Sequence, residues 1–219
     1  MNIRVIFSEE LERLRYDILT MASRVEEDLG KALGALRNND KALAKEVQAN
    51  DEVINALQVR IEEEAATLIA TQQPVAGDMR ELVAVFKITG NLERAGDHAV
   101  HLAKTAVKLS GKAPVREAEH LERMAETGRT MIRAAVSAYL GKNAAAARAA
   151  AAMDDGIDAE HRALTEETLH RMKEHPELIK GAVRLLNTSG YLERLGDHIT
   201  NICEAVVYMV ENKHEELNE

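Results

Sequence analysis

The sequence predicts an all-α protein made of two tandem, pseudo-symmetric antiparallel three-helix bundles, with six long helices. Its composition favours helices, since Trp is absent, aromatic residues make up only 3%, and Ala, Leu, Glu and Arg are abundant. The stretch Gly90–His98 returns one hundred residues later as Gly190–His198, with seven of nine positions identical. A match of that length at a fixed offset indicates an internal duplication. All three prolines, Pro74, Pro114 and Pro176, stand where a helix would begin.

The length of 219 residues allows two similar halves of about 100 residues. The segment 109–114 combines a glycine that would end one helix with a proline that would begin the next. We therefore place the boundary there and predict one three-helix repeat over residues 1–111 and a second over residues 112–219. Helices this long would form elongated rods rather than a globule.

The first half is predicted to contain three helices joined by short connections. Ser8, followed by two glutamates, is typical of an N-cap, and the first helix should end near Asn38. The second helix should run from about Asp40 to Thr71. The third begins after Pro74 and carries the first copy of the repeated motif.

The second half repeats this order. The fourth helix is expected from about Val115 to Leu140. The fifth opens with the run Ala144–Ala152, which favours a helix but offers little apolar area, so we expect a packed or exposed extension rather than a binding surface. The sixth should run from Pro176 to about His214, carry the second motif and end in a frayed acidic tail.

Charge, cysteine content and targeting signals exclude several classes of protein. The formal net charge of −9 argues against a nucleic-acid surface, because phosphate contacts need clustered Lys and Arg. The single cysteine, Cys203, stands in an apolar register and is expected to be a buried, inert thiol. The Met1–Arg4 start lacks the apolar core of a signal peptide, and no run approaches the roughly eighteen apolar residues of a membrane span. We therefore expect a cytoplasmic protein.

Each motif copy places two acids on one helix face. Glu93 and Asp97, and likewise Glu193 and Asp197, are four residues apart and project from the same side of a helix. Each pair lies about 100° from an apolar seam, on the flank of a helix contact. A solvated face has no reason to keep the same acids in both copies. A functional acidic site and a role in packing and solubility are the two interpretations.

The motif also repeats two glycines in each copy, Gly90 with Gly96 and Gly190 with Gly196. A glycine inside a helix costs about 1 kcal/mol relative to alanine. Its recurrence predicts that a neighbouring helix or a ligand approaches the backbone at these positions.

Acids on the second helix of each half can join these pairs. Asp51 lies on the flank of that helix in the first half, and Asp154 and Asp158 hold a similar register in the second. Carboxylates so close repel one another unless a cation intervenes or one takes a proton, so metal binding would stabilise them. Oxygen-rich sets suit hard cations such as Mg²⁺, Mn²⁺, Ca²⁺ or iron.

Two histidines, His98 and His198, would widen the range of metals if their rings reached the acids. His98 lies one residue beyond Asp97 and thus about 100° round the helix. We therefore expect it to pair on the stripe of Arg94, with metal ligation as the alternative.

These residues resemble the twin motifs of the PhoU family of phosphate-transport accessory regulators. The resemblance rests on Leu92–Asp97, on Leu192–His198 followed by Asn201–Glu204, and on Pro74–Leu82. It extends over the whole chain in length, duplication and helix order. It implies Glu/Asp-x-x-x-Asp motifs that hold metal ions or a multinuclear iron cluster, with Mg, Mn or Zn as the other candidates.

By the same resemblance, the protein would lower phosphate uptake and silence phosphate-starvation genes when phosphate is plentiful. Its partners would be the ATPase subunit of the phosphate ABC transporter and the sensor histidine kinase. It would form a homodimer and meet the membrane only through these partners. The family's motif acids correspond by position to Glu93, Asp97, Glu193, Asp197, Asp51, Asp154 and Asp158.

Two positions depart from the family pattern. Asn55 replaces an acid in the first half, and His101 stands where the second copy has Asn201. Equal metal binding by the two halves therefore cannot be assumed.

Two other classes of protein stay open. A di-metal carboxylate enzyme would show Glu-x-x-His on core helices. That spacing occurs at Glu117/His120, Glu167/His170 and Glu211/His214. None recurs at an equivalent position in the other half, which favours chance pairs on helix surfaces. A structural coiled-coil scaffold would explain the apolar seams but not the repeated acids. No activated nucleophile or phosphate-binding loop is recognisable, so we expect no enzyme activity, and nothing predicts that the protein itself binds phosphate.

Overall fold

The computed structural model describes residues 3–109 and 115–218, and this part of the chain is helical without a strand. The helices are α1 (Ile3–Asn38), α2 (Lys41–Gln72), α3 (Ala76–Leu109), α4 (Val115–Leu140), α5 (Ala144–Ala151), α6 (Asp154–Glu174), the 3₁₀ turn η1 (Pro176–Leu178) and α7 (Ile179–Glu211). The all-α prediction of two three-helix halves is confirmed. The expected boundary between residues 111 and 112 lies outside the described residues and stays a prediction.

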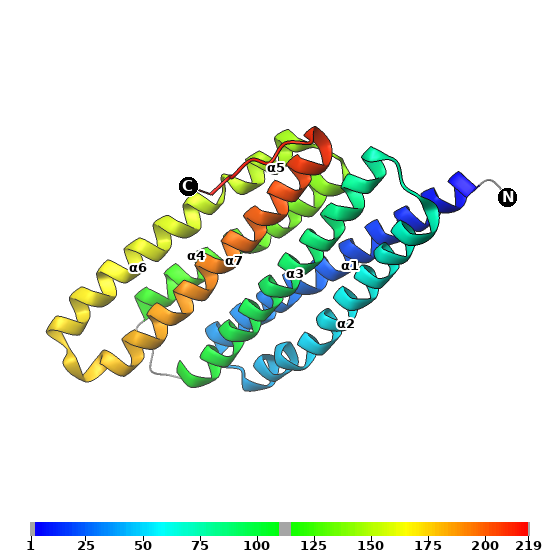
Figure 1. Cartoon of the computed structure of the whole chain (residues 1–219). Coiled ribbons are helices and arrows are strands. Elements are labelled where there is room, and N and C mark those ends of the chain that lie inside the picture. The colour runs from blue at the N-terminus through cyan, green and yellow to red at the C-terminus, as the bar shows by residue number, and fades with distance from the viewer. Residues whose placement is uncertain (1–2, 110–114, 219) are drawn as a thin grey trace.

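The two halves share one core. Within the halves, α3 packs on α1 and α2, and α7 packs on α4, α5 and α6. Between them, α3 lies along α7 and α1 along α4, so these four long helices form the middle of the elongated body (Figure 1). The buried apolar side chains belong to one continuous cluster that includes both halves. No helix of the described residues is long and apolar enough to cross a bilayer.

Most helix ends fall close to their expected positions, and their caps explain why. Asp40 caps α2 by accepting hydrogen bonds from the backbone N–H groups of Ala42 (2.9 Å) and Leu43 (3.0 Å). Ser8 is not an N-cap as expected, because α1 begins earlier, and the buried Phe7 continues the apolar stripe upstream. The residues of α4 match the prediction at both ends.

The predicted fifth helix is interrupted. α5 starts at the cap Asn143, whose side chain accepts from the Ala146 N–H (3.0 Å), but the helix stops at Ala151 and α6 begins at Asp154. Two acids at the start of α6 favour a helix N-terminus, because the helix dipole is positive there. A glycine at position 156 further weakens a continuous helix.

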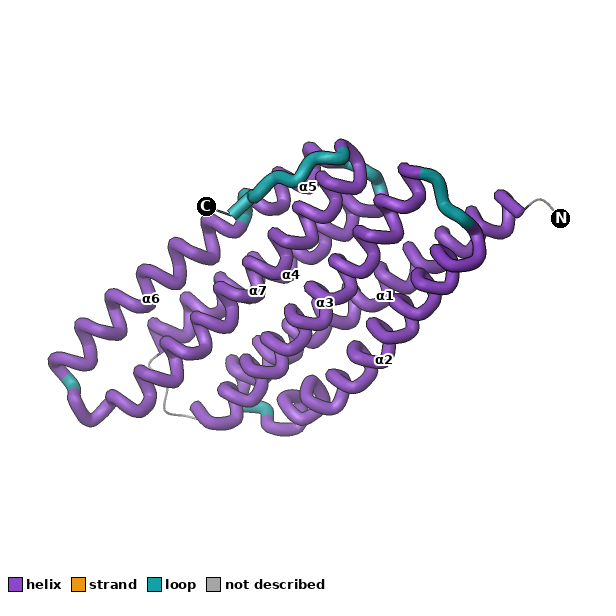
Figure 2. Tube along the Cα trace, in the orientation of Figure 1, coloured by secondary structure: helices purple, strands orange, loops and turns teal. Residues whose placement is uncertain are grey.

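The expected frayed tail is wrong, because residues 212–218, which we call the return segment, pack on the protein. Asn212 takes a left-handed conformation (φ 55°) that ends α7 at Glu211 rather than at His214. The chain then turns back over α5 and α7 (Figure 2). Arg148 of α5 pairs with Glu211 (2.9 Å) and with Glu215 (2.6 Å), which holds the segment in place.

A buried ion cluster joins α3 to α1 in the first half and to the α4–α5 turn in the second half. The Glu81 side chain of α3 is only 3% exposed and accepts hydrogen bonds from Arg15 of α1 (2.6 Å) and from Lys142 of the α4–α5 turn (2.7 Å). Burial opposes the charge of Glu81, but these two donors outweigh it and lower the pKa of the carboxyl. The buried ion cluster therefore joins three elements that are distant in sequence.

Candidate metal centres

The structure brings four of the predicted acids into one cavity between α6 and α7. This cavity of about 390 Å³ is lined by Asp154 and Asp158 of α6 and by Glu193 and Asp197 of α7. Asp154 and Asp158 are one turn apart, as are Glu193 and Asp197, so each helix presents both acids of its pair on one face. We call these four residues the second acidic cluster.

Asp154 is the most buried member of this cluster. It is 6% exposed, its Oδ1 has no hydrogen-bond partner, and its Oδ2 accepts from the Thr200 hydroxyl at 3.4 Å. Burial, followed by repulsion from Asp158, Asp197 and Glu193, raises the pKa of Asp154 to about 7. A buried carboxylate oxygen without a donor is suited to a cation.

The same causes act on the acids of α7. The pKa of Glu193 is raised by burial and then by Asp197, and the pKa of Asp197 is raised by burial and then by Asp158. The charged forms therefore destabilise one another. A divalent cation would relieve this repulsion.

Gly196 allows Asp154 to reach α7. A Cβ at position 196 would lie 2.0 Å from Asp154 Oδ1 and 3.2 Å from Ile157 Cδ1, far inside contact distance. The carboxylate fills the space that a side chain would take, and the cost of a glycine in mid-helix is thereby explained.

The other repeated glycines behave differently. A Cβ at Gly96 would meet Ile54 of α2 at 3.3 Å, which is tight packing between helices. At Gly90 the nearest atom would be 3.9 Å away, an ordinary contact, and at Gly190 nothing lies within 4 Å. The predicted close approach is thus confirmed at Gly96 and Gly196 and is wrong at Gly190.

The first acidic cluster comprises Asp51 of α2 with Glu93, Asp97 and His101 of α3. Burial, followed by the charge of Asp97, raises the pKa values of both Asp51 and Glu93. His101 faces the same acids, and burial, then Lys104, lowers its pKa against their attraction. His101 is therefore beside the acids of this cluster.

Asn55 replaces an acid near the first cluster, and its side-chain oxygen is buried without a hydrogen-bond partner. An amide oxygen is a ligand for hard cations, although it carries no charge. The first cluster thus combines three carboxylates, one imidazole and one neutral oxygen.

The donor sets of both clusters fit hard cations, but the side chains are not gathered around a single point. Among the described residues, no three His, Cys, Asp or Glu side chains are placed to hold one ion together. Asp197 Oδ1 accepts a hydrogen bond from Asn218 (2.8 Å), and Asp97 Oδ2 accepts one from Arg94 (3.4 Å). Cation binding therefore requires these carboxylates to exchange protein donors for the metal.

The histidines next to the motif acids meet at the contact between the halves. The ring of His98 stacks on that of His198, with centroids 5.5 Å apart, and also lies 5.9 Å from the ring of Tyr191. The histidine of the second half also contacts α3, because His198 Nδ1 is 2.9 Å from Asn91 Oδ1. His98 therefore packs on α7. The expectation that it pairs on the stripe of Arg94 is wrong. Positions 91 and 191, which differ between the motif copies, each contact the histidine of the other half.

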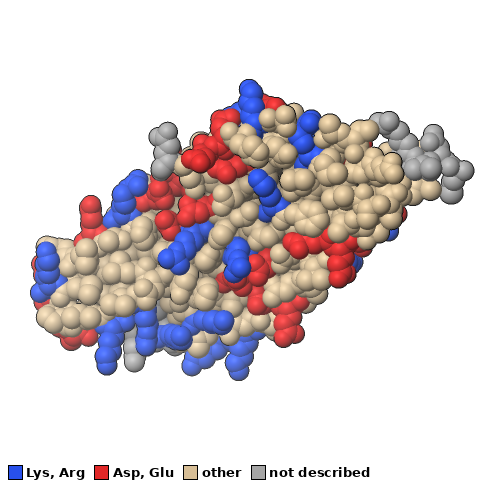
Figure 3. Space-filling view, in the orientation of Figure 1, with Lys and Arg blue, Asp and Glu red and all other residues tan. Residues whose placement is uncertain are grey.

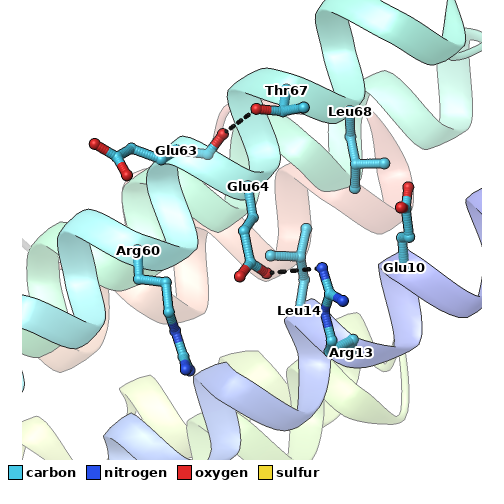
Figure 4. A pocket seen from close by; sticks show the side chains of 8 residues that line it. All are labelled: Glu10, Arg13, Leu14, Arg60, Glu63, Glu64, Thr67 and Leu68. Carbon is cyan, nitrogen blue, oxygen red and sulfur yellow. Dashed lines mark hydrogen bonds and ion pairs between the residues drawn. The ribbon is translucent and has the colours of Figure 1, made fainter.

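Acidic side chains are distributed in separate groups over the face that shows α2, α3, α6 and α7, with basic side chains between them (Figure 3). A groove between α1 and α2 differs from the acidic clusters, because two arginines line it beside its glutamates. Within the groove, Arg13 pairs with Glu64 at 3.4 Å (Figure 4). The other lining arginine, Arg60, pairs with Asp17 outside the groove at 2.8 Å. The groove therefore mixes basic and acidic side chains, unlike the four acids gathered in the cavity at α6 and α7.

The Glu-x-x-His spacings expected of a di-metal enzyme differ in burial. His120 is only 7% exposed, with its Nδ1 2.6 Å from Glu160 Oε2 and its Nε2 3.5 Å from Glu167 Oε2. The other two spacings lie at the surface. Glu211 pairs with Arg148, the ring of His214 stacks on Tyr208 (4.6 Å), and His170 is exposed. The side chain of Glu117 lies outside the described residues. Cys203 is fully buried as expected, and burial raises its pKa to about 12, which keeps the thiol protonated.

Sequence reasoning missed the residues that border the second cluster from outside the motifs. Arg148, Asp155, Leu217 and Asn218 all line the cavity. Arg148 is the only charge in the alanine run Ala144–Ala152, and that contrast was the available signal. Arg148, Ala151 and Ala152 of the run line the candidate cavity, and the expectation that the run is no binding surface stays a prediction. No local pattern pointed to Asn218.

Comparison with known proteins identifies the family. The model of the PhoU domain matches residues 18–106 and, a second time, residues 121–206. The chain belongs to the PhoU domain family. It is 33% identical over 217 residues to the phosphate-specific transport system accessory protein PhoU homolog of Clostridium acetobutylicum, covering 99% of both chains.

Solved PhoU structures show the same fold. The crystal structure of PhoU from Pseudomonas aeruginosa superposes with a TM-score of 0.90 at 31% identity, covering 94% of this chain and all of that one. The phosphate transport system regulatory protein PhoU from Streptococcus pneumoniae gives 0.89 at 32% identity, with 95% and 99% covered. The tandem match confirms that the PhoU-domain chain is a duplicated helical protein.

Proposed function

We propose that this PhoU-domain chain is a negative regulator of phosphate uptake and of the phosphate-starvation response. The observation that carries the proposal is the full-length similarity to accessory proteins of phosphate-specific transport systems, across 99% of both chains. Two PhoU domains in one chain, with the same helix order as two solved PhoU structures, support it.

The protein acts through partners, which are the ATPase subunit of the phosphate ABC transporter and the sensor histidine kinase. It works in the cytoplasm as a homodimer and reaches the membrane only through these proteins. The relatives' names support a place beside the transport machinery.

The two acidic clusters bind metal ions, either iron in a multinuclear cluster or Mg, Mn or Zn. Asp51, Glu93 and Asp97 are the ligands in the first half, and Asp154, Asp158, Glu193 and Asp197 are the ligands in the second. The raised pKa values in both clusters and the unpartnered Oδ1 of Asp154 support this proposal. These acids would hold the cation between α2 and α3 and between α6 and α7, where it would neutralise their charges.

A reporter of the starvation response tests both parts of the proposal. A phosphatase reporter is read in high phosphate in cells that lack the gene or carry it as the only copy. In the test variant, Glu93 and Glu193 become Gln, and Asp97 and Asp197 become Asn, which removes charge but keeps side-chain volume. The matched control changes four exposed glutamates, Glu9, Glu63, Glu166 and Glu174, to Gln. Circular dichroism confirms that both variants are helical.

We expect deletion to switch the reporter on, the control to keep it silent, and the cluster variant to leave it active. A reporter that stays silent after deletion contradicts the regulatory role and favours the di-metal enzyme. A silent reporter in the cluster variant means that the acids are structural or dispensable for regulation.

A further inference from the structure

The return segment ends at the second acidic cluster. From Asp197 to Glu211, α7 rises about 21 Å at 1.5 Å per residue. The seven residues of the return segment, in extended form, span about 23 Å at 3.3 Å per residue. The left-handed turn at Asn212 sends them back along α7, so the segment is long enough to bring Asn218 to Asp197. There the Asn218 amide donates a hydrogen bond to Asp197 Oδ1 at 2.8 Å.

Several contacts hold the segment along this path. Arg148 pairs with Glu211 and Glu215, and the backbone N–H of Leu217 donates to Glu204 Oε1 at 2.9 Å. The side chain of Leu217 packs on the apolar core. The segment is therefore fixed at its middle and near its end.

The same residues form part of the wall of the acidic cavity. Arg148, Leu217 and Asn218 line it together with the four acids of the second cluster. The guanidinium of Arg148 is a cation, and the neutral amide of Asn218 turns its N–H, the positive end of its dipole, to Asp197. Both favour carboxylates over a cation. Among the acids of this cavity, Asp154 has its Oδ1 buried against Gly196 without a hydrogen-bond partner.

We propose that the return segment is a strap that competes with a divalent cation for the second acidic cluster. Asn218 holds Asp197 in the described conformation, and a cation that takes Asp197 together with Asp154 releases the segment. The proposal rests on the metal sites of the proposed function. It concerns the second half alone, because the chain after α3 continues into α4.

Competition makes the effects of cation binding and of segment docking on each other reciprocal. The factor by which the cation weakens docking of the segment equals the factor by which docking weakens cation binding, so a variant that docks less must bind the cation more tightly. Metal at the second cluster would thereby be converted into release of the return segment and exposure of Glu215 and Leu217, its part-buried residues. A partner could read that exposure as the signal.

The test uses the full chain, stripped with EDTA and titrated with Mn²⁺ by calorimetry. Asn218→Ala removes the hydrogen bond to Asp197, and Glu215→Gln weakens the anchor on Arg148 without touching the cluster. Asn187→Ala, at an exposed position of α7, is the matched control. Asp154→Asn identifies the binding signal of the second cluster. Hydrogen exchange at the Leu217 amide, with and without Mn²⁺, reports docking of the segment.

We expect Asn218→Ala to bind Mn²⁺ about fivefold more tightly at the second cluster, with Glu215→Gln changing in the same direction. Loss of the negative charge of Glu215 would by itself weaken cation binding. Tighter binding of Mn²⁺ by Glu215→Gln would therefore be due to weaker docking of the segment. Mn²⁺ should speed exchange at Leu217 in the wild type and in Asn187→Ala, but not in Asp154→Asn.

Different outcomes overturn different proposals. If Mn²⁺ binds the wild type while exchange at Leu217 stays unchanged or slows, the strap is wrong and the metal sites stand. Weaker binding by Asn218→Ala would make Asn218 a ligand and also contradict competition. If no variant binds Mn²⁺, the strap fails together with the metal part of the proposed function.

Discussion

At the scale of single residues, Asp154 is the clearest case of stability given up at a candidate site. Its carboxyl is buried, lacks a partner at Oδ1 and has a pKa raised from 3.8 to about 7. A raised pKa means that the folded protein binds this proton more tightly than the unfolded chain does. The contribution of Asp154 to stability is therefore most favourable below about pH 4 and falls as pH rises towards 7.

Asp154→Asn should remove this penalty. At about pH 8, without metal, we expect the free energy of unfolding of the variant to exceed that of the wild type by on the order of 2 kcal/mol. The gap should close as pH falls to about 4. Urea unfolding of EDTA-treated protein, followed by circular dichroism across this range, measures it. A gap of the same size at every pH would show that the proton is not its cause.

The residue scale also shows what sequence could and could not predict. All seven predicted acids came from helical spacing, repetition and family resemblance, and the structure gathers four of them in one cavity. Arg148 and Asn218 have no such periodic signal, because they reach the cavity from α5 and from the return segment. Contacts between segments that are distant along the chain leave no local pattern.

At the scale of elements, Glu81 joins α3 to α1 and to the α4–α5 turn through one nearly buried carboxylate. Removing one partner of a buried ion pair leaves the other charges without compensation, which costs more than the pair itself contributes. The elements most affected are those that place α3 against both halves.

Glu81→Gln should lower the free energy of unfolding by about 2–3 kcal/mol, somewhat below the cost for a fully buried pair because Lys142 is half exposed. The matched control is Glu64→Gln, which breaks the exposed pair with Arg13 and should change stability by less than about 0.5 kcal/mol. Urea midpoints of the two variants give the comparison. Equal losses would mean that burial does not decide the effect.

Element boundaries were predictable where a cap or a proline marks them, as at Asp40 and before α4. The break between α5 and α6 was missed, because nine consecutive residues containing eight alanines favour a continuous helix. The acids and the glycine that follow determine where the new helix starts. The end of α7 was missed for another reason, since it depends on the left-handed Asn212.

At the scale of the whole molecule, the two halves are joined by one continuous core, although the duplication alone allowed two separate cores. A single continuous apolar core favours one cooperative unfolding transition. The equivalent leucines Leu92 and Leu192 are both fully buried, one in each half.

Leu92→Ala and Leu192→Ala should therefore each destabilise the entire molecule. We expect either change to lower the free energy of unfolding by about 2–5 kcal/mol and to do so equally for peptides of both halves. Hydrogen exchange read by mass spectrometry at increasing urea separates the halves. Earlier opening of only the substituted half would show that each bundle unfolds alone.

The contact of α3 with α7 shows what fusing two copies into one polypeptide makes possible. In a symmetric pair of identical chains, the residue that meets the partner's histidine must be the same on both sides of the axis. In one fused chain the two sides are independent, and here Asn91 meets His198 by a hydrogen bond while Tyr191 meets His98 through its ring. The chain thus retains the shape of a twofold assembly, although its two halves do not make identical contacts. Each half can therefore change its side of the contact without a matching change in the other.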